Sequence, residues 1–165
     1  MYEPGEYIHC GSSGLCKVED ITTLDFSEAG RDRLYYRLAP VEESSGTLYI
    51  PVDNDKVPMR RVLTKEEAAE LIRDIPGIGM LEVPDEKKRE NCYREALSSM
   101  DCHVWVMMIK TLAQRMKARS DEGKKLLATE ERYYHAVKKR LDCELAVAMD
   151  LTSEELDQYV ADFTA

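Results

Sequence analysis

The chain has 165 residues, of which 44% are hydrophobic and 33% are charged, a balance that supports a folded core and argues against wholesale disorder. Its formal net charge of -9 argues, for the chain as a whole, against binding to nucleic acid, because phosphate contacts require local positive charge. The sequence has no uncharged apolar run long enough to span a bilayer and no secretory signal at its start. We therefore expect a cytoplasmic protein that is not attached to a membrane.

The charge is unevenly distributed along the chain. Residues 87–140 hold 14 Lys/Arg and 7 Asp/Glu, whereas residues 64–86 hold 2 and 7. Residues 1–63 hold 7 and 11, and residues 141–165 hold 7 acidic residues and no basic one. A basic centre thus lies between acidic flanks, which keeps contact with DNA open for that part of the chain.

Up to residue 63, short β-prone runs alternate with Gly, Ser, Pro and acidic residues, which is typical of a small β module. Glycines at positions 11–14 and 44–46 favour turns, and residues 24–31 predict a longer hairpin loop. Five short strands in about 60 residues can bury a core only by curling into a partly open barrel. The predicted strands are Glu6–Cys10, Leu15–Thr23, Leu34–Leu38, Thr47–Pro51 and Met59–Leu63.

After residue 63 the pattern becomes helical. Capping boxes are predicted at Thr64 with Glu67 and again at Thr152, and Asp85 and Asp101 can cap two further helices. The first predicted helix begins at Thr64 and ends before Pro76. The other four span 85–98, 101–119, 129–149 and 152–163. The third has an apolar stripe of period 3.6, which predicts a buried face. The stripe consists of Trp105, Met108, Ile109, Leu112 and Met116.

The sequence offers no motif for catalysis or metal binding. Its five cysteines are never spaced as CxxC, which favours reduced thiols over a zinc site or a disulfide framework. The three histidines lack metal-ligand spacing, and His9 and Cys10 are neighbours on a predicted strand, so their side chains point to opposite faces. No GxGxxG or Walker-type loop is present. We expect neither an enzyme nor a metal, cofactor or small-molecule substrate.

Three segments taken in order, YEPGEYIHCGSSGLCKVEDI, LYYRLAP and TLYIPVDNDKVPMRRVL, resemble the CarD family of bacterial RNA polymerase-binding transcription regulators. The resemblance rests on Gly5-Glu6, Gly14, Tyr35-Tyr36, Ile50-Pro51 and Met59-Arg60 at workable spacing. It continues in the helical half, where LLATEERYYHAVKKRLDCELAVA is similar to the family's penultimate helix, including its Glu144-Leu145-Ala146 ending.

This resemblance implies an α+β chain of two domains. Residues 1–63 would form a five-stranded Tudor-like (SH3-like), partly open β-barrel that docks on the β subunit of RNA polymerase. Residues 64–165 would form a helical DNA-binding domain that contacts promoter DNA at the upstream edge of the transcription bubble and modulates the stability of the open complex. The resemblance implies no catalysis.

The resemblance also indicates candidate DNA contacts. The best studied relatives insert a tryptophan as a wedge at the start of the second long helix, and Glu86 occupies that position here. A carboxylate cannot replace an apolar wedge between bases. The basic run that follows, 87–89, does match the family, and so does Arg132 on the penultimate helix. Lys124 and Lys125, which precede that helix, add to these basic residues. The candidates are Lys87, Lys88, Arg89, Arg132, Lys124 and Lys125, for which the alternative is a solvated helix face.

The candidate polymerase contacts are Leu24, Tyr49, Ile50 and Pro51. Leu24 and Tyr49 occupy positions that are basic in some relatives, so charge pairing is lost at both. Docking by addition of an edge strand does not need these charges, and the amphipathic ring of Tyr49 suits an interface. The alternatives are a half-buried strand tyrosine for Tyr49 and a loop residue folded over the barrel for Leu24.

A second hypothesis stays open. The chain can be a protein–protein adaptor that docks through its β-barrel without touching DNA. Glu86 and the net charge of -9 favour it. The only tryptophan, Trp105, is expected in the core rather than at the DNA.

Overall fold

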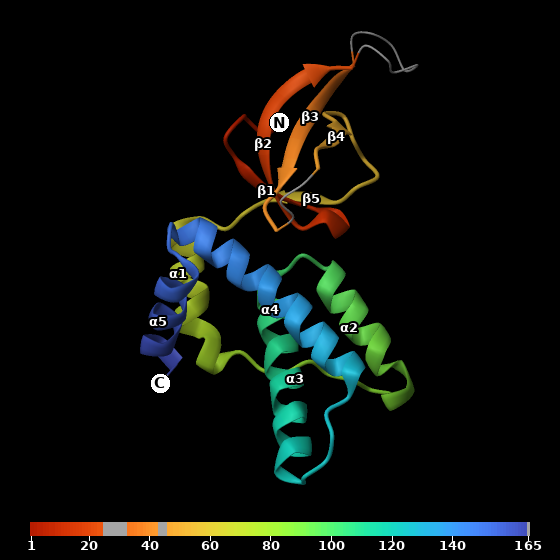
Figure 1. Cartoon of the computed structure of the whole chain (residues 1–165), viewed down its shortest axis with the longest axis vertical. Coiled ribbons are helices and arrows are strands. Elements are labelled where there is room, and N and C mark those ends of the chain that lie inside the picture. Colours follow the sequence, from red (N-terminus) through yellow and green to blue (C-terminus); the bar gives the residue numbers. More distant parts are fainter. Residues whose placement is uncertain (25–32, 43–45, 165) are drawn as a thin grey trace. The chain divides into compact units, whose positions relative to one another are not determined.

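The computed structural model describes residues 1–24, 33–42 and 46–164. The chain divides into two compact units, Met1–Val62 and Leu63–Ala165, which are distinguished by colour in Figure 1. Most of the loop predicted at 24–31, and the serines of the turn predicted at 44–46, lie outside the described residues. The α+β class predicted from the sequence is confirmed, with strands confined to the first unit and α-helices to the second.

The N-terminal unit is an antiparallel sheet with the strand order β4-β3-β2-β1-β5. All five predicted strands are present, with ends that differ by at most two residues. The third continues past Leu38 because Pro40 still pairs with Cys16 of its neighbour. The strands are β1 (Tyr7–Cys10), β2 (Leu15–Thr23), β3 (Leu34–Pro40), β4 (Leu48–Pro51) and β5 (Met59–Arg61).

The sheet does not close into a barrel. Its edges are β4 and β5, and within the described residues these two strands do not pair with each other. One face is covered by a small core that contains Ile8, Val18 and Leu38 together with the thiols of Cys10 and Cys16. Burial raises the pKa of the Cys10 thiol and raises that of Cys16 to about 12, so both remain neutral thiols at physiological pH.

The second unit consists of five α-helices. Both predicted capping boxes are present: the Thr64 hydroxyl accepts from the Glu67 amide at 3.1 Å, and the Thr152 hydroxyl accepts from the Glu155 amide at 3.2 Å. Pro76 follows α1 within a short 3-10 turn. The helices are α1 (Lys65–Asp74), α2 (Arg89–Ser98), α3 (Cys102–Asp121), α4 (Ala128–Met149) and α5 (Ser153–Thr164).

The second helix begins later than Asp85, the position that the sequence predicts. Asp85 does act as a cap, because its Oδ1 accepts from the amide of Lys87 at 3.0 Å. The amide of Lys88, however, donates to the Asp85 carbonyl three residues back, which makes the first turn a 3-10 helix, η3 (Glu86–Lys88). The α-helical pattern therefore starts at Arg89.

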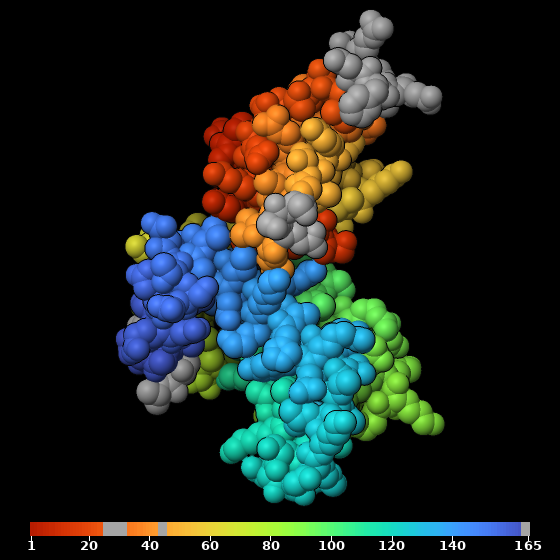
Figure 2. Space-filling model, in the orientation of Figure 1, coloured from red at the N-terminus to blue at the C-terminus, as the bar shows by residue number. Residues whose placement is uncertain are grey.

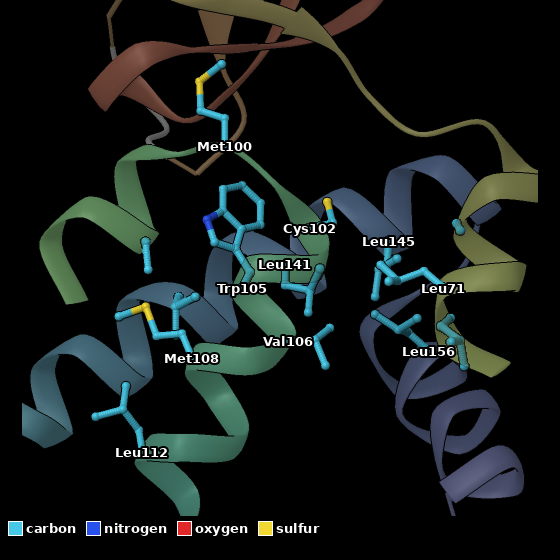
Figure 3. Packing of buried hydrophobic residues seen from close by; sticks show 14 of the residues in the cluster. Leu71, Met100, Cys102, Trp105, Val106, Met108, Leu112, Leu141, Leu145 and Leu156 are labelled. Atoms are coloured by element: carbon cyan, nitrogen blue, oxygen red, sulfur yellow. The ribbon is translucent and has the colours of Figure 1, made fainter. Parts of the chain in front are cut away.

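The helical core is built on the predicted stripe of α3. Trp105, Met108 and Leu112 are fully buried, while Ile109 and Met116 are partly buried. Figure 3 shows the indole of Trp105 surrounded by side chains of the cluster, and its Nε1–H donates to the carbonyl of Leu97 at 3.1 Å. Trp105 is thus a core residue with a satisfied polar atom, as the stripe predicts.

The helical unit has two ends. Helices α1 and α5 pack together and against α4 at one end, while α3 packs against α4 and α2. Among the described residues, no helix combines the length and the apolar character needed to cross a bilayer.

Candidate interaction surfaces

Strand β4 is an edge of the sheet and carries three of the predicted polymerase contacts. Tyr49 lies opposite Arg37 of β3, and its side chain is 43% exposed. The next residue, Ile50, lies opposite Tyr36 and packs against the core. Tyr49 and Ile50 thus face opposite sides of the sheet, as the period of a strand requires. Only Tyr49 can offer its side chain to a partner on the outer face.

The other two predicted residues lie at strand ends. Leu24 directly follows β2 and is half-buried, and Pro51 is the last residue of β4, half-buried opposite Tyr35. Pro51 also limits the edge, because a proline has no amide to donate to an added strand. A partner strand can therefore pair only with the few residues that precede it.

Arg37 is a neighbour of Tyr49 that the sequence analysis missed. Its Nε lies 3.3 Å from Oε2 of Glu19 on β2, and both side chains are about two-fifths exposed. A row of Glu19, Arg37 and Tyr49 thus crosses three strands of the outer face. The alternation in β3 was the available signal, because Tyr36 and Leu38 face the core and the residue between them must face outward.

Several contacts join the start of α4 to α2. Nη2 of Arg132 lies 3.6 Å from Oε1 of Glu90, and the rings of Tyr93 and Tyr133 lie 5.7 Å apart between centroids. The guanidinium of Arg132 also lies 5.4 Å from the centroid of the Tyr133 ring, yet its side chain remains 68% exposed. The predicted basic position on α4 therefore stands beside the start of α2 and faces solvent.

The loop between α3 and α4 contains Lys124 and Lys125, two of the predicted DNA contacts. The Nε of Arg119, at the end of α3, donates to the carbonyl of Lys125 at 2.9 Å, which fixes the path of this loop. Lys124 forms an exposed ion pair with Glu122 at 2.9 Å, whereas the Lys125 side chain has no ion pair within the described part of the chain. Both ammonium groups are accessible.

The basic run at the start of α2 divides into two kinds of residue. Lys87 and Lys88 are exposed, and neither forms an ion pair with any described residue. Arg89, by contrast, is mostly buried: its guanidinium binds both carboxylate oxygens of Glu86, and its Nη1 donates to the Tyr93 hydroxyl at 3.2 Å. These hydrogen bonds from Arg89 hold the pKa of the Glu86 carboxyl below its ordinary value.

The opposite end of the helical unit is acidic. In Figures 1 and 2, α5 is dark blue and lies far from the cyan segment that leads from α3 into α4. The acids exposed on the paired helices α1 and α5 include Glu66, Glu70, Glu154, Glu155 and Asp157. The predicted basic contacts Lys87, Lys88, Lys124, Lys125 and Arg132, by contrast, lie near the starts of α2 and α4.

The described residues contain no cluster of three or more His, Cys, Asp or Glu side chains that could hold a metal ion. The surface features described above are the edge strand that presents Tyr49 on one unit and the exposed basic side chains near the starts of α2 and α4 on the other.

Comparison with known proteins bears on the N-terminal unit as a whole. Residues 2–63 match the family model described as the CarD-like/TRCF RID domain, and the match ends where the helical unit begins. A search of curated proteins gave no match. The RID family is a family of non-enzymatic, RNA polymerase-interacting domains. Residues 2–63 of this chain are thus similar to the CarD-like/TRCF RID domain, and this match supports an interaction with RNA polymerase and a role related to transcription.

Proposed function

We propose that the chain is a transcription regulator that docks on the β subunit of RNA polymerase through β4 and contacts promoter DNA through the basic end of the helical unit. The observation that carries the proposal is the match to an RNA polymerase-interacting domain over the unit whose edge strand presents Tyr49. An exposed edge can accept a partner strand through main-chain hydrogen bonds, while side chains such as Tyr49 provide specificity.

The DNA part of the proposal rests on the grouping of charges. Four of the basic candidates are exposed: Lys87, Lys88, Lys125 and Arg132. The ion pair of Glu90 with Arg132 and the hydrogen bond from Arg119 to the Lys125 carbonyl hold the segments that carry them at one end of the unit. Each phosphate contact made by such residues adds salt-dependent affinity and carries no sequence preference. Docking on polymerase supplies the effective concentration that a weak DNA contact needs.

The proposed effect is a population shift. A factor that binds the melted promoter better than the closed one favours the open complex by the difference in binding free energy. About 1.4 kcal/mol of such a difference changes the ratio of the two complexes tenfold. The partner surfaces of this activity are the β subunit and the upstream edge of the bubble.

The polymerase contact is tested by the affinity of the full chain for core RNA polymerase. We expect Tyr49→Ala to weaken binding about tenfold, because exposed aromatic anchors dominate interfaces of this kind. Val41→Ala is the matched control, since Val41 is almost equally exposed (41%) but lies beyond β3 rather than on the edge strand. Equal affinities for wild type and Tyr49→Ala would exclude β4 as the docking edge.

The DNA contact is tested by the lifetime of open complexes formed with polymerase and the full chain. We expect the double variant Lys87→Glu/Lys88→Glu to lose the effect on lifetime. Arg89 is left intact, because changing it would also break its internal pair with Glu86. Lys65→Glu/Arg73→Glu is the control: it makes the same change in net charge at two exposed residues of α1, at the acidic end, and should act like wild type.

The adaptor is a second candidate function, favoured by the neutralisation of Arg89 by Glu86 and by the net charge of -9. It predicts that the Lys87→Glu/Lys88→Glu variant binds polymerase and affects open complexes as wild type does. The two functions therefore differ in the outcome of a single experiment.

A further inference from the structure

Glu86 and Arg89 form a two-pronged ion pair at the start of α2. The Arg89 Nε lies 2.9 Å from one carboxylate oxygen of Glu86, and its Nη2 contacts the other. A planar guanidinium that holds two oxygens of one acceptor is also the geometry with which arginine binds phosphate. The carboxylate of Glu86 therefore stands where a phosphate group would bind.

The two partners of this pair are held very differently. The Arg89 side chain is only 16% exposed and is anchored by the hydroxyl of Tyr93, a residue that is almost fully buried. The Glu86 side chain is 72% exposed, and within the described residues its carboxylate accepts hydrogen bonds only from Arg89. The guanidinium is therefore held in place from the interior, whereas the carboxylate that it binds belongs to an exposed side chain.

Basic side chains lie beside the pair. Lys87 and Lys88 are exposed on the turn between Glu86 and Arg89, and the exposed Arg132 adjoins Glu90 one residue further along. The two exposed ammonium groups beside Arg89 thus add attraction for an approaching phosphate.

We propose that the guanidinium of Arg89 is a latent phosphate-binding site that Glu86 occupies in the free chain and that a DNA backbone phosphate occupies when the helical unit binds DNA. The inference rests on the proposed function, because it requires that the start of α2 meets DNA. Since Glu86 is three residues away on the same turn, its effective concentration at Arg89 is high. The Glu86 carboxylate therefore weakens DNA binding by the free chain, and it makes the contact between Arg89 and a DNA phosphate depend on docking to polymerase.

The test is the binding of the full-length chain to a short fluorescent DNA duplex, measured by anisotropy between 50 and 200 mM salt, conditions under which phosphate contacts are strongly salt-dependent. Glu86→Gln should tighten binding at the lowest salt by roughly threefold or more and steepen the dependence of log K on log salt by about one, because one further phosphate is engaged. Glu86→Gln/Arg89→Gln should lose both gains.

Glu82→Gln is the matched control. Glu82 is exposed in the same segment between α1 and α2, and it forms no ion pair with a described arginine. Its substitution by glutamine removes the same charge as Glu86→Gln. We expect it to tighten binding less than Glu86→Gln and to leave the salt slope unchanged. Thermal unfolding checks that every variant is folded.

Equal gains from Glu82→Gln and Glu86→Gln would overturn the proposal, since Glu86 would then act only through general charge. A gain that survives in the Glu86→Gln/Arg89→Gln variant would overturn it as well. If one of these two results were found and the Lys87→Glu/Lys88→Glu variant also lost affinity for the duplex, the proposed DNA contact would stand without the latent site. If no variant bound the duplex at the lowest salt, both the latent site and the proposed DNA contact would fall.

Discussion

The fully buried carboxylate of Glu144 on α4 accepts a hydrogen bond from the backbone amide of Leu63, with 3.1 Å between Oε2 and N. The thiol of Cys102, the first residue of α3, lies 3.5 Å from the same oxygen. One side chain thus joins the start of the helical unit, the start of α3 and the last turns of α4, three segments that are far apart in sequence.

We expect Glu144→Ala to destabilise the helical unit by about 1–3 kcal/mol, the typical cost of leaving a buried polar group without its partner. Glu144→Gln keeps a side-chain oxygen of similar size and position and should retain much of that stability. Urea unfolding of both variants, followed by the fluorescence of Trp105, measures the difference. Equal losses in the two variants would mean that the Leu63 hydrogen bond contributes nothing.

Trp105 should act in stability and not in DNA binding. Trp105→Phe removes the hydrogen bond to the Leu97 carbonyl and leaves part of a fully buried site empty, so we expect a loss of about 1–3 kcal/mol in the free energy of unfolding. Unfolding followed by circular dichroism measures the loss. DNA affinity of the folded variant should equal that of wild type, and a selective fall in affinity would instead indicate that the indole serves as a wedge.

The N-terminal sheet should lose stability in alkaline solution through Cys16. The pKa of this thiol is about 12 in the folded chain against an ordinary value of 9.0. Above pH 9 the unfolded chain therefore releases a proton that the folded chain keeps. The contribution of Cys16 is complete below pH 9 and decreases as the pH rises toward 12, by up to about 1.4 kcal/mol per pH unit.

Urea unfolding between pH 8 and 10, followed by the circular dichroism of the sheet, measures this dependence. Cys16→Ala should be less stable at pH 8, because it leaves a small cavity, but its stability should decrease less steeply with pH. A slope identical to that of wild type would show that another group is responsible.

The elements of this fold could be predicted because their signals are local. The β-prone run at 15–23 and the hydroxyl–carboxylate spacing of Thr64 and Glu67 each lie within a few consecutive residues, and the strand and the capping box are both present in the structure. The stripe around Trp105 likewise depends only on the helical period. Such patterns need no knowledge of which segments meet.

The contacts between side chains could not be predicted in the same way. Arg37 meets Glu19 because the register of β2 shifts between Val18 and Asp20, and a bulge of this kind changes which residues face each other. The pairing of Arg89 with Glu86 depends on its anchor, Tyr93, being buried by distant residues. Sequence could indicate a basic run at this turn but not that one of its charges is already neutralised.

The open edge strand β4 exposes the chain to self-association when no polymerase is bound. Its residues Leu48, Tyr49 and Ile50 include no charge, although charged side chains are the usual protection of an open edge against pairing with a second copy. That protection falls to Pro51, which ends the edge after a few residues. Replacing Pro51 would lengthen the open edge and favour self-association through the same strand that is proposed to dock on polymerase.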